Sequence, residues 1–213
     1  MIKRYRIPVL IGMVTAAIGF LITYADLTIY MGVNAATGVP LGYDGREIFT
    51  ALCAALGGPL AAVIAILQFP FIGLYLSLPA IGVALVMLDR LAASLAVVFL
   101  YRFMYLHIKR LPFILLFWAA TIWAYYAISY NIEVISSCIL SSRNLIETYK
   151  NYGIWEVISL FSALEPPFTY VFTILILLAI PPRFRKPLWI QAKEQTAQEK
   201  PDDRTNLAER FAH

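Results

Sequence analysis

The residues best suited to chemistry are five charged side chains at the edges of apolar stretches: Arg46, Glu47, Asp89, Arg90 and Glu165. A guanidinium offers a fork of donors that suits carboxylate or phosphate groups, and a helix N-terminus also attracts anions. We expect the first four to line an outward-facing polar cup for a small ligand, with Arg46 binding its anionic group. The alternative is that they are solvated helix caps.

Glu165 is the carboxylate that we expect at the greatest membrane depth. It directly precedes Pro166 and Pro167, a pair that breaks or kinks a helix. A carboxylate within a bilayer costs on the order of 3 kcal/mol on insertion scales, so it is usually paired or functional. We expect Glu165 to face a protein-lined cavity. Alternatively, residues 155–166 lie at the interface and only the residues from Pro167 onward cross.

Signatures of catalysis are missing from the chain. Its only histidines are His107 and His213, so a histidine-based metal site or catalytic triad is not expected. It has no phosphate-binding glycine loop and no aromatic platform for nucleic acid. We expect no enzymatic activity, metal, cofactor or nucleic-acid partner, and a structural role for Cys53 and Cys138.

The composition places these residues in an integral membrane protein. Hydrophobic residues make up 61% of the 213 residues and charged residues 14%, far from the values of soluble domains. We expect an all-α transmembrane bundle over residues 1–182 and a polar cytoplasmic tail over residues 183–213. The net charge of +4 comes from Lys and Arg beside apolar runs, which indicates membrane topology.

The first two spans are expected over Ile7–Ala25 and Glu47–Leu67. A bilayer core requires about 20 apolar residues, and both runs have that length. Residues 28–43 form an outer loop between them, and Gln68–Pro70 ends the second span. Halfway through that span the chain has small residues and a helix breaker, Gly57, Gly58 and Pro59. We expect these to thin the helix for close packing, with direct ligand contact as the alternative.

Two interpretations fit the stretch from Phe71 to Ile108, because Asp89 and Arg90 interrupt it. One is a single span over residues 80–101. The other is a hairpin of two short helices over residues 71–88 and 91–108. The hairpin puts the basic residues at 102, 109 and 110 on the same side as those at the N-terminus, so the positive-inside rule favours it.

The last two spans are expected over Pro112–Tyr130 and from Trp155 to Ile180. Residues 131–155 would form the longest outer loop, and its isoleucines recur at helical spacing. Part of this loop is therefore expected to lie flat on the membrane. These assignments add up to about six spans with both termini in the cytoplasm.

Asp44-Gly45-Arg46 followed by Gly57-Gly58-Pro59 resembles the LytS-type five-transmembrane sensor region, the LYT family. That region stands at the N-termini of bacterial histidine kinases and diguanylate cyclases, and the resemblance covers roughly residues 20–110. It implies a sensor in the bacterial cytoplasmic (inner) membrane. The family usually continues with an Arg and a Gly-Gly turn, whereas residues 68–75 here read Gln-Phe-Pro-Phe-Ile-Gly-Leu-Tyr.

A second resemblance lies in the tail, which is similar to the opening of GGDEF cyclase domains at Asp202, Thr205, Leu207 and Arg210. We therefore expect a non-catalytic sensory or signalling module that binds a small ligand. Its expected partners are the lipid bilayer, a small-molecule ligand, and a second copy or a signalling protein. The alternatives are a vitamin-type substrate-binding subunit of a transporter and a structural factor that docks a membrane partner.

Overall fold

The computed structural model describes residues 3–27, 29–33, 40–43, 45–142, 144–150, 165–188 and 190. These residues are mostly helical, with one short antiparallel hairpin where an outer loop was expected. The elements are α1 (Lys3–Tyr24), β1 (Ile29–Val33), β2 (Pro40–Tyr43), α2 (Arg46–Gly57), α3 (Pro59–Ile66), α4 (Gln68–Tyr75), α5 (Ala80–His107), α6 (Leu111–Ser141), α7 (Leu145–Thr148), α9 (Glu165–Ala179) and the 3-10 turn η2 (Pro182–Phe184).

Among the described residues, three helices are long and apolar enough to cross a membrane, over Tyr5–Tyr24, Ala80–His107 and Leu111–Ser129. Two shorter apolar helical stretches in the same part of the chain cover Pro59–Tyr75 and Glu165–Ala179. The helices indicate a membrane-embedded protein, and the first of them covers most of the expected first span. They do not establish the expected six-span bundle.

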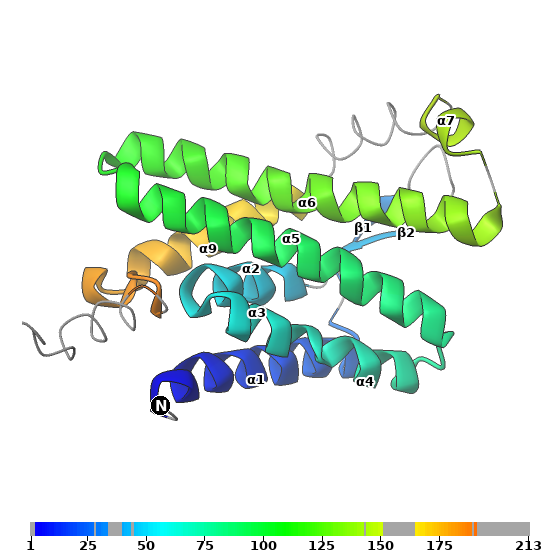
Figure 1. The fold of residues 1–213 in the computed structure, drawn as a ribbon, viewed down its shortest axis with the longest axis horizontal. Helices are drawn as coiled ribbons and strands as arrows, with labels where there is room; N and C mark the ends of the chain where they lie inside the picture. The colour runs from blue at the N-terminus through cyan, green and yellow to red at the C-terminus, as the bar shows by residue number, and fades with distance from the viewer. Residues whose placement is uncertain are drawn as a thin grey trace, which may run out of the picture.

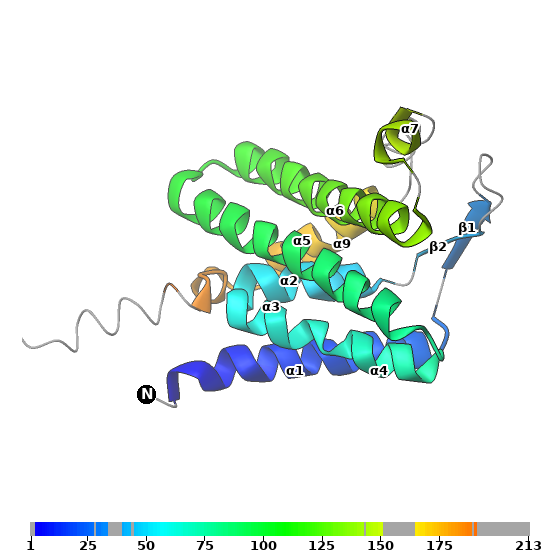
Figure 2. The same cartoon turned by 45° about the vertical axis from the view of Figure 1, so that its right-hand side comes forward.

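The helices lie roughly side by side and form a bundle with two distinct ends (Figures 1 and 2). One end holds the start of α1, the α5–α6 connection and η2. We call it the basic end, because Arg6, Lys109, Arg110, Arg185 and Lys186 lie there. The opposite end holds β1, β2, α7 and the α4–α5 connection (Figure 2).

The expectation of one continuous helix over Glu47–Leu67 is wrong, because the chain reverses at Gly58. This residue has φ 80° and ψ −166°, a conformation that residues with a side chain rarely adopt. A Cβ built on Gly57 would lie 2.4 Å from the Cβ of Ala61, whereas residues four apart on one helix keep their Cβ atoms about 5–6 Å apart. Helix α2 runs toward the basic end, and α3 and α4 run back (Figure 1).

Gln68–Pro70 does not end a span as expected. These residues begin α4, and Pro70 falls in its first turn, where a missing N–H costs nothing. Gln68 is 1% exposed, and its Nε2 donates to the carbonyl of Ala65 at 3.0 Å. The amide is buried against α1, where a Cβ built on Gly19 would clash with its Oε1.

The hairpin expected at Asp89-Arg90 is also wrong, because α5 continues through both residues from Ala80 to His107. The rejected alternative of a single span is nearer the structure. Asp89-Arg90 is not a typical turn pair, and both side chains meet partners inside the bundle instead of leaving it. The basic residues do gather at one end of the bundle, but the reversal that brings them there is at Gly58.

The later elements also differ from expectation. Helix α6 extends to Ser141, so residues 131–141 continue the preceding helix and are not a separate segment. Helix α9 begins at Glu165, with Pro166 and Pro167 in its first turn, where proline is well tolerated. The expected start of this span at Trp155 and the cyclase-like motif in the tail lie outside the described residues.

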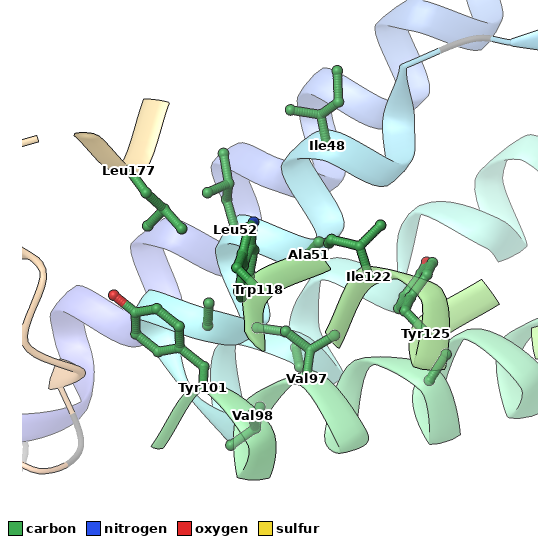
Figure 3. Close-up of a cluster of buried hydrophobic side chains, with 14 of the residues drawn as sticks. Ile48, Ala51, Leu52, Val97, Val98, Tyr101, Trp118, Ile122, Tyr125 and Leu177 are labelled. Carbon is green, nitrogen blue, oxygen red and sulfur yellow. The ribbon is translucent and has the colours of Figure 1, made fainter. Parts of the chain in front are cut away.

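Bulky side chains of α5 and α6 form the core against small residues of α2 and α3 (Figure 3). Trp118, Ile122 and Tyr125 are fully buried. The alanines at 51, 54, 55, 61, 62 and 65 have no exposed surface. Small residues let membrane helices approach closely, which matters because lipid gives no hydrophobic drive for helices to associate.

Gly12 offers a test of this close packing, with Gly82 as its control. A Cβ built on Gly12 would lie 2.7 Å from the Ile64 Cβ and 2.8 Å from the Ala61 carbonyl oxygen, whereas one built on Gly82 meets nothing within 4 Å. We expect Gly12→Ala to destabilise the protein by about 1–3 kcal/mol and Gly82→Ala to leave it unchanged or slightly stabilised. Thermal unfolding in detergent checks this; equal melting temperatures for the two variants would contradict the α1–α3 contact.

Candidate functional site

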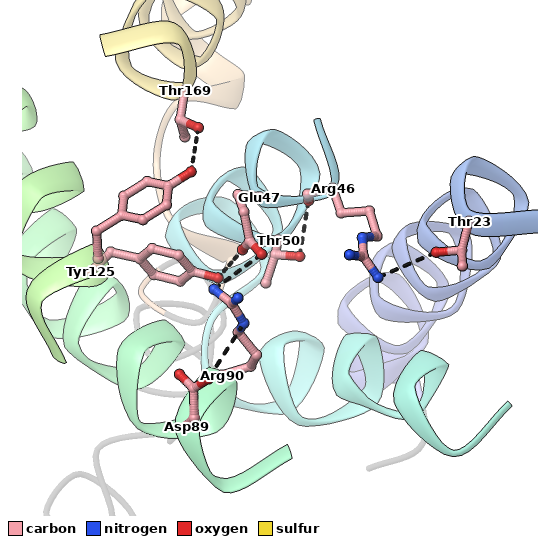
Figure 4. A network of polar contacts seen from close by, with 9 residues as sticks. Thr23, Arg46, Glu47, Thr50, Asp89, Arg90, Tyr125 and Thr169 are labelled. Atoms are coloured by element: carbon pink, nitrogen blue, oxygen red, sulfur yellow. Dashed lines mark hydrogen bonds and ion pairs between the residues drawn. The ribbon is translucent and has the colours of Figure 1, made fainter. Parts of the chain in front are cut away.

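Three of the five predicted site residues meet in one buried group with a tyrosine (Figure 4). Arg90 Nη1 of α5 lies 3.1 Å from Glu47 Oε1 of α2, and Arg90 Nε lies 3.7 Å from Asp89 Oδ2. Tyr125 of α6 donates its hydroxyl hydrogen bond to Glu47 Oε2. These four residues, from three helices, are called the polar cluster below.

The charged groups of the polar cluster are buried deeply enough that each must be paired with another. The side chains of Asp89 and Glu47 are 6% and 12% exposed, and that of Arg90 is 22% exposed. An unpaired charge in such surroundings costs several kcal/mol, whereas a paired and hydrogen-bonded one is tolerated. The expectation that these groups are solvated caps is therefore wrong for Asp89 and Glu47.

Two hydrogen-bond donors at the polar cluster make no hydrogen bond to any described residue. They are Arg90 Nε and the hydroxyl of Ser94, which is fully buried one turn further along the same side of α5. The ion pair of Nε with Asp89 is too long to count as a hydrogen bond. A buried polar group normally has a partner, so these two donors have capacity for a hydrogen-bond acceptor.

Arg46 lies apart from the polar cluster, although it neighbours Glu47 in the sequence. Successive helix residues point about 100° apart, and Arg46 Nη1 donates to Thr23 Oγ1 at the end of α1 at 3.2 Å. Figure 4 shows the two side chains pointing in different directions. Arg46 thus joins α1 to α2, and its anion-binding role stays a prediction.

A series of polar contacts that the sequence did not reveal runs from the polar cluster along α6 and α9. Tyr126, next to Tyr125, shares a 2.8 Å hydrogen bond with Thr169 Oγ1. One turn further along α9, the Thr173 hydroxyl accepts a hydrogen bond from Trp118 Nε1 of α6 at 2.8 Å. The same hydroxyl donates to the Thr169 carbonyl at 2.6 Å. The only signal in the sequence is the spacing of the two threonines, which puts both on one side of α9.

This series of contacts ends at the basic end. Trp118 packs edge-on against Tyr101 of α5, with ring centroids 5.6 Å apart. The Tyr101 hydroxyl donates to the Arg185 carbonyl at 2.8 Å. Arg185 in turn donates from Nε to the Ile180 carbonyl at 2.7 Å, at the end of α9. We call the contacts from Tyr126 through Thr169, Thr173, Trp118 and Tyr101 to Arg185 the α6–α9 series.

The remaining predicted residues lie elsewhere. Glu165 is half-buried at the first position of α9, one turn before Thr169. Gly57, Gly58 and Pro59 form the reversal between α2 and α3, which gives them a packing role. None of these residues belongs to the polar cluster.

Within the part of the chain that the structure describes, no group of three or more His, Cys, Asp or Glu side chains could hold a metal ion. Comparison with known protein families, with curated proteins and with solved structures finds no match for this chain. The resemblance to the LYT family therefore stays a prediction. What the chain can do has to be argued from the polar cluster itself.

The ion pair between Glu47 and Arg90 should show strong energetic coupling. We expect Arg90→Leu and Glu47→Leu each to destabilise the protein by about 3–5 kcal/mol. The first removes the guanidinium that two buried carboxylates face, and the second removes the closer of those carboxylates from Arg90. The double variant should lose at least about 1 kcal/mol less than the sum. Denaturation in mixed micelles measures this. In a control cycle of Lys109→Leu and Glu147→Leu, at opposite ends of the bundle, the two losses of stability should add. If the losses at positions 47 and 90 also add, the ion pair is contradicted.

Proposed function

We propose that this chain is a non-catalytic sensory or signalling module of the bacterial cytoplasmic membrane. The observation that carries the proposal is the polar cluster, in which Glu47, Asp89, Arg90 and Tyr125 meet among apolar helices. Ionisable groups at such positions are usually functional, because burying them without use is costly. The resemblance at Arg46 and at Gly57–Pro59 to a bacterial sensor region supports the same class of function.

The ligand that suits the polar cluster is small, neutral and able to accept a hydrogen bond. Arg90 Nε and the Ser94 hydroxyl can each donate one. A further carboxylate would be repelled, because Glu47 and Asp89 already face the single guanidinium. The part of Arg90 that remains exposed gives such a ligand access.

The signal would pass to the basic end through the α6–α9 series. Glu47 and Tyr125 are hydrogen-bonded, and Tyr126 holds α9 at Thr169. A ligand that binds one arrangement of the polar cluster better than another shifts the population of that arrangement. Because Tyr101 holds the chain directly after α9, a shift of α9 would move the start of the polar tail, where a signalling partner or a second copy can bind.

Ligand binding is tested by thermal shift of the purified chain in detergent. We expect small neutral amides to raise the melting temperature and their parent carboxylates to leave it unchanged. Ser94→Ala and Glu47→Gln should abolish the rise, because they remove the hydroxyl and weaken the hold on Arg90. The control Glu147→Gln removes an exposed carboxylate outside the polar cluster and should keep the full response.

An amide effect that persists in Ser94→Ala and Glu47→Gln, or no response to any amide, would reject this site. Purified protein that carries a tightly bound vitamin or an ATPase pair would instead favour a transport subunit. Loss of function on deleting residues 187–213, with no ligand found, would favour a docking factor.

The orientation that we propose places the basic end in the cytoplasm. Lys and Arg flank spans preferentially on that side, and both chain termini would then be cytoplasmic. In a background with Cys53 and Cys138 replaced, a membrane-impermeant maleimide should label Glu147→Cys in intact cells. It should label Lys109→Cys only after permeabilisation. Both positions are exposed, so labelling of both in intact cells would contradict the orientation.

A further inference from the structure

An apolar groove of about 390 Å³ lies along the seam between α1 and α2, away from the polar cluster. Its walls are mainly aliphatic and aromatic side chains, among them Leu10, Val14, Ile18, Phe49, Leu52 and Leu56. Leu10 and Val14 are 60% and 49% exposed, so the groove is open at the surface of the bundle. The groove volume falls within the range of about 300–1,000 Å³ that is typical of ligand pockets.

The groove runs lengthwise along the bundle and not across it. On α1 it extends from Leu10 to Ile18, which is about 12 Å at 1.5 Å per residue. Helix α2 runs antiparallel to α1 (Figure 1), so Leu56 lies toward the basic end and Phe49 toward the opposite end. A lipid acyl chain in a bilayer has the same direction as helices that cross it.

A cation stands at the basic end of the groove. Arg6 precedes Leu10 by four residues on α1, so both lie on the same side of the helix. Its side chain is exposed, and a long cationic side chain near a helix end can reach the lipid head groups. The groove thus combines an apolar wall with one positive charge at its membrane-surface end.

We propose that the α1–α2 groove binds one anionic phospholipid, with an acyl chain along the groove and the phosphate at Arg6. The apolar lining accounts for the chain, and the guanidinium accounts for the preference for a negatively charged head group. This site is separate from the polar cluster, so its existence does not depend on the proposed sensory function.

The test is native mass spectrometry of the full chain after detergent extraction, with phosphatidylglycerol or phosphatidylcholine added back. The wild-type chain should retain one phosphatidylglycerol more strongly than phosphatidylcholine. Arg6→Gln should lose most of that preference, about fivefold, since one basic side chain near the surface contributes about 1 kcal/mol. Lys109→Gln, which removes an exposed charge at the same end, should keep the preference.

A second variant tests the groove itself. Val14→Trp should fill it and lower retention of both lipids, whereas Leu116→Trp, on the exposed side of α6, should not. Equal retention of the two lipids by the wild-type chain would overturn the proposal. So would an unchanged preference in Arg6→Gln, or a chain dimer that excludes lipid and is broken by Val14→Trp.

Discussion

The ion pair between Arg90 and Glu47 is the interaction on which the arrangement of the bundle depends. A guanidinium cannot be deprotonated in a protein, so once α5 crosses an apolar layer its charge must meet an acceptor there. Glu47 supplies that acceptor from α2, Asp89 adds a second carboxylate from α5, and Tyr125 binds Glu47 from α6. The pair therefore fixes which helices lie together and at what relative height.

The small residues of α2 and α3 make this meeting possible. Gly58 turns the chain back, and the neighbouring alanines let both arms of the turn lie against α1 and α5 without large side chains between them. In water such alanines would bury little apolar area, but within a membrane close contact itself stabilises the packing. The reversal thus brings the start of α2 to the height of Arg90.

The sequence was sufficient to predict a helical membrane protein with a long apolar first helix, and it singled out residues 47, 89 and 90, which the structure brings together. Hydropathy and charge report which residues are apolar, and that information is local. The place of the reversal was not predictable in this way, because Gly57-Gly58-Pro59 and Asp89-Arg90 both interrupt apolar runs. Which of the two interruptions is the reversal depends on the contact between Arg90 and its partner on another helix. Hydropathy contains no information about that contact. Tyr125 and Thr169 were missed for the same reason, since their roles arise from pairing between helices.

The two helices α5 and α6 are longer than the hydrocarbon layer that they could cross. Helix α5 has 28 residues and α6 has 31, or about 42 and 46 Å, against a hydrocarbon thickness of about 30 Å. Such helices must tilt or project, and the balance between the two follows the thickness of the surrounding lipid. Since Arg90 and Tyr125 are carried by these two helices, the depth of the polar cluster in the host membrane is tied to its lipid composition. A thicker bilayer would decrease the tilt of α5 and α6, and a thinner one would increase it.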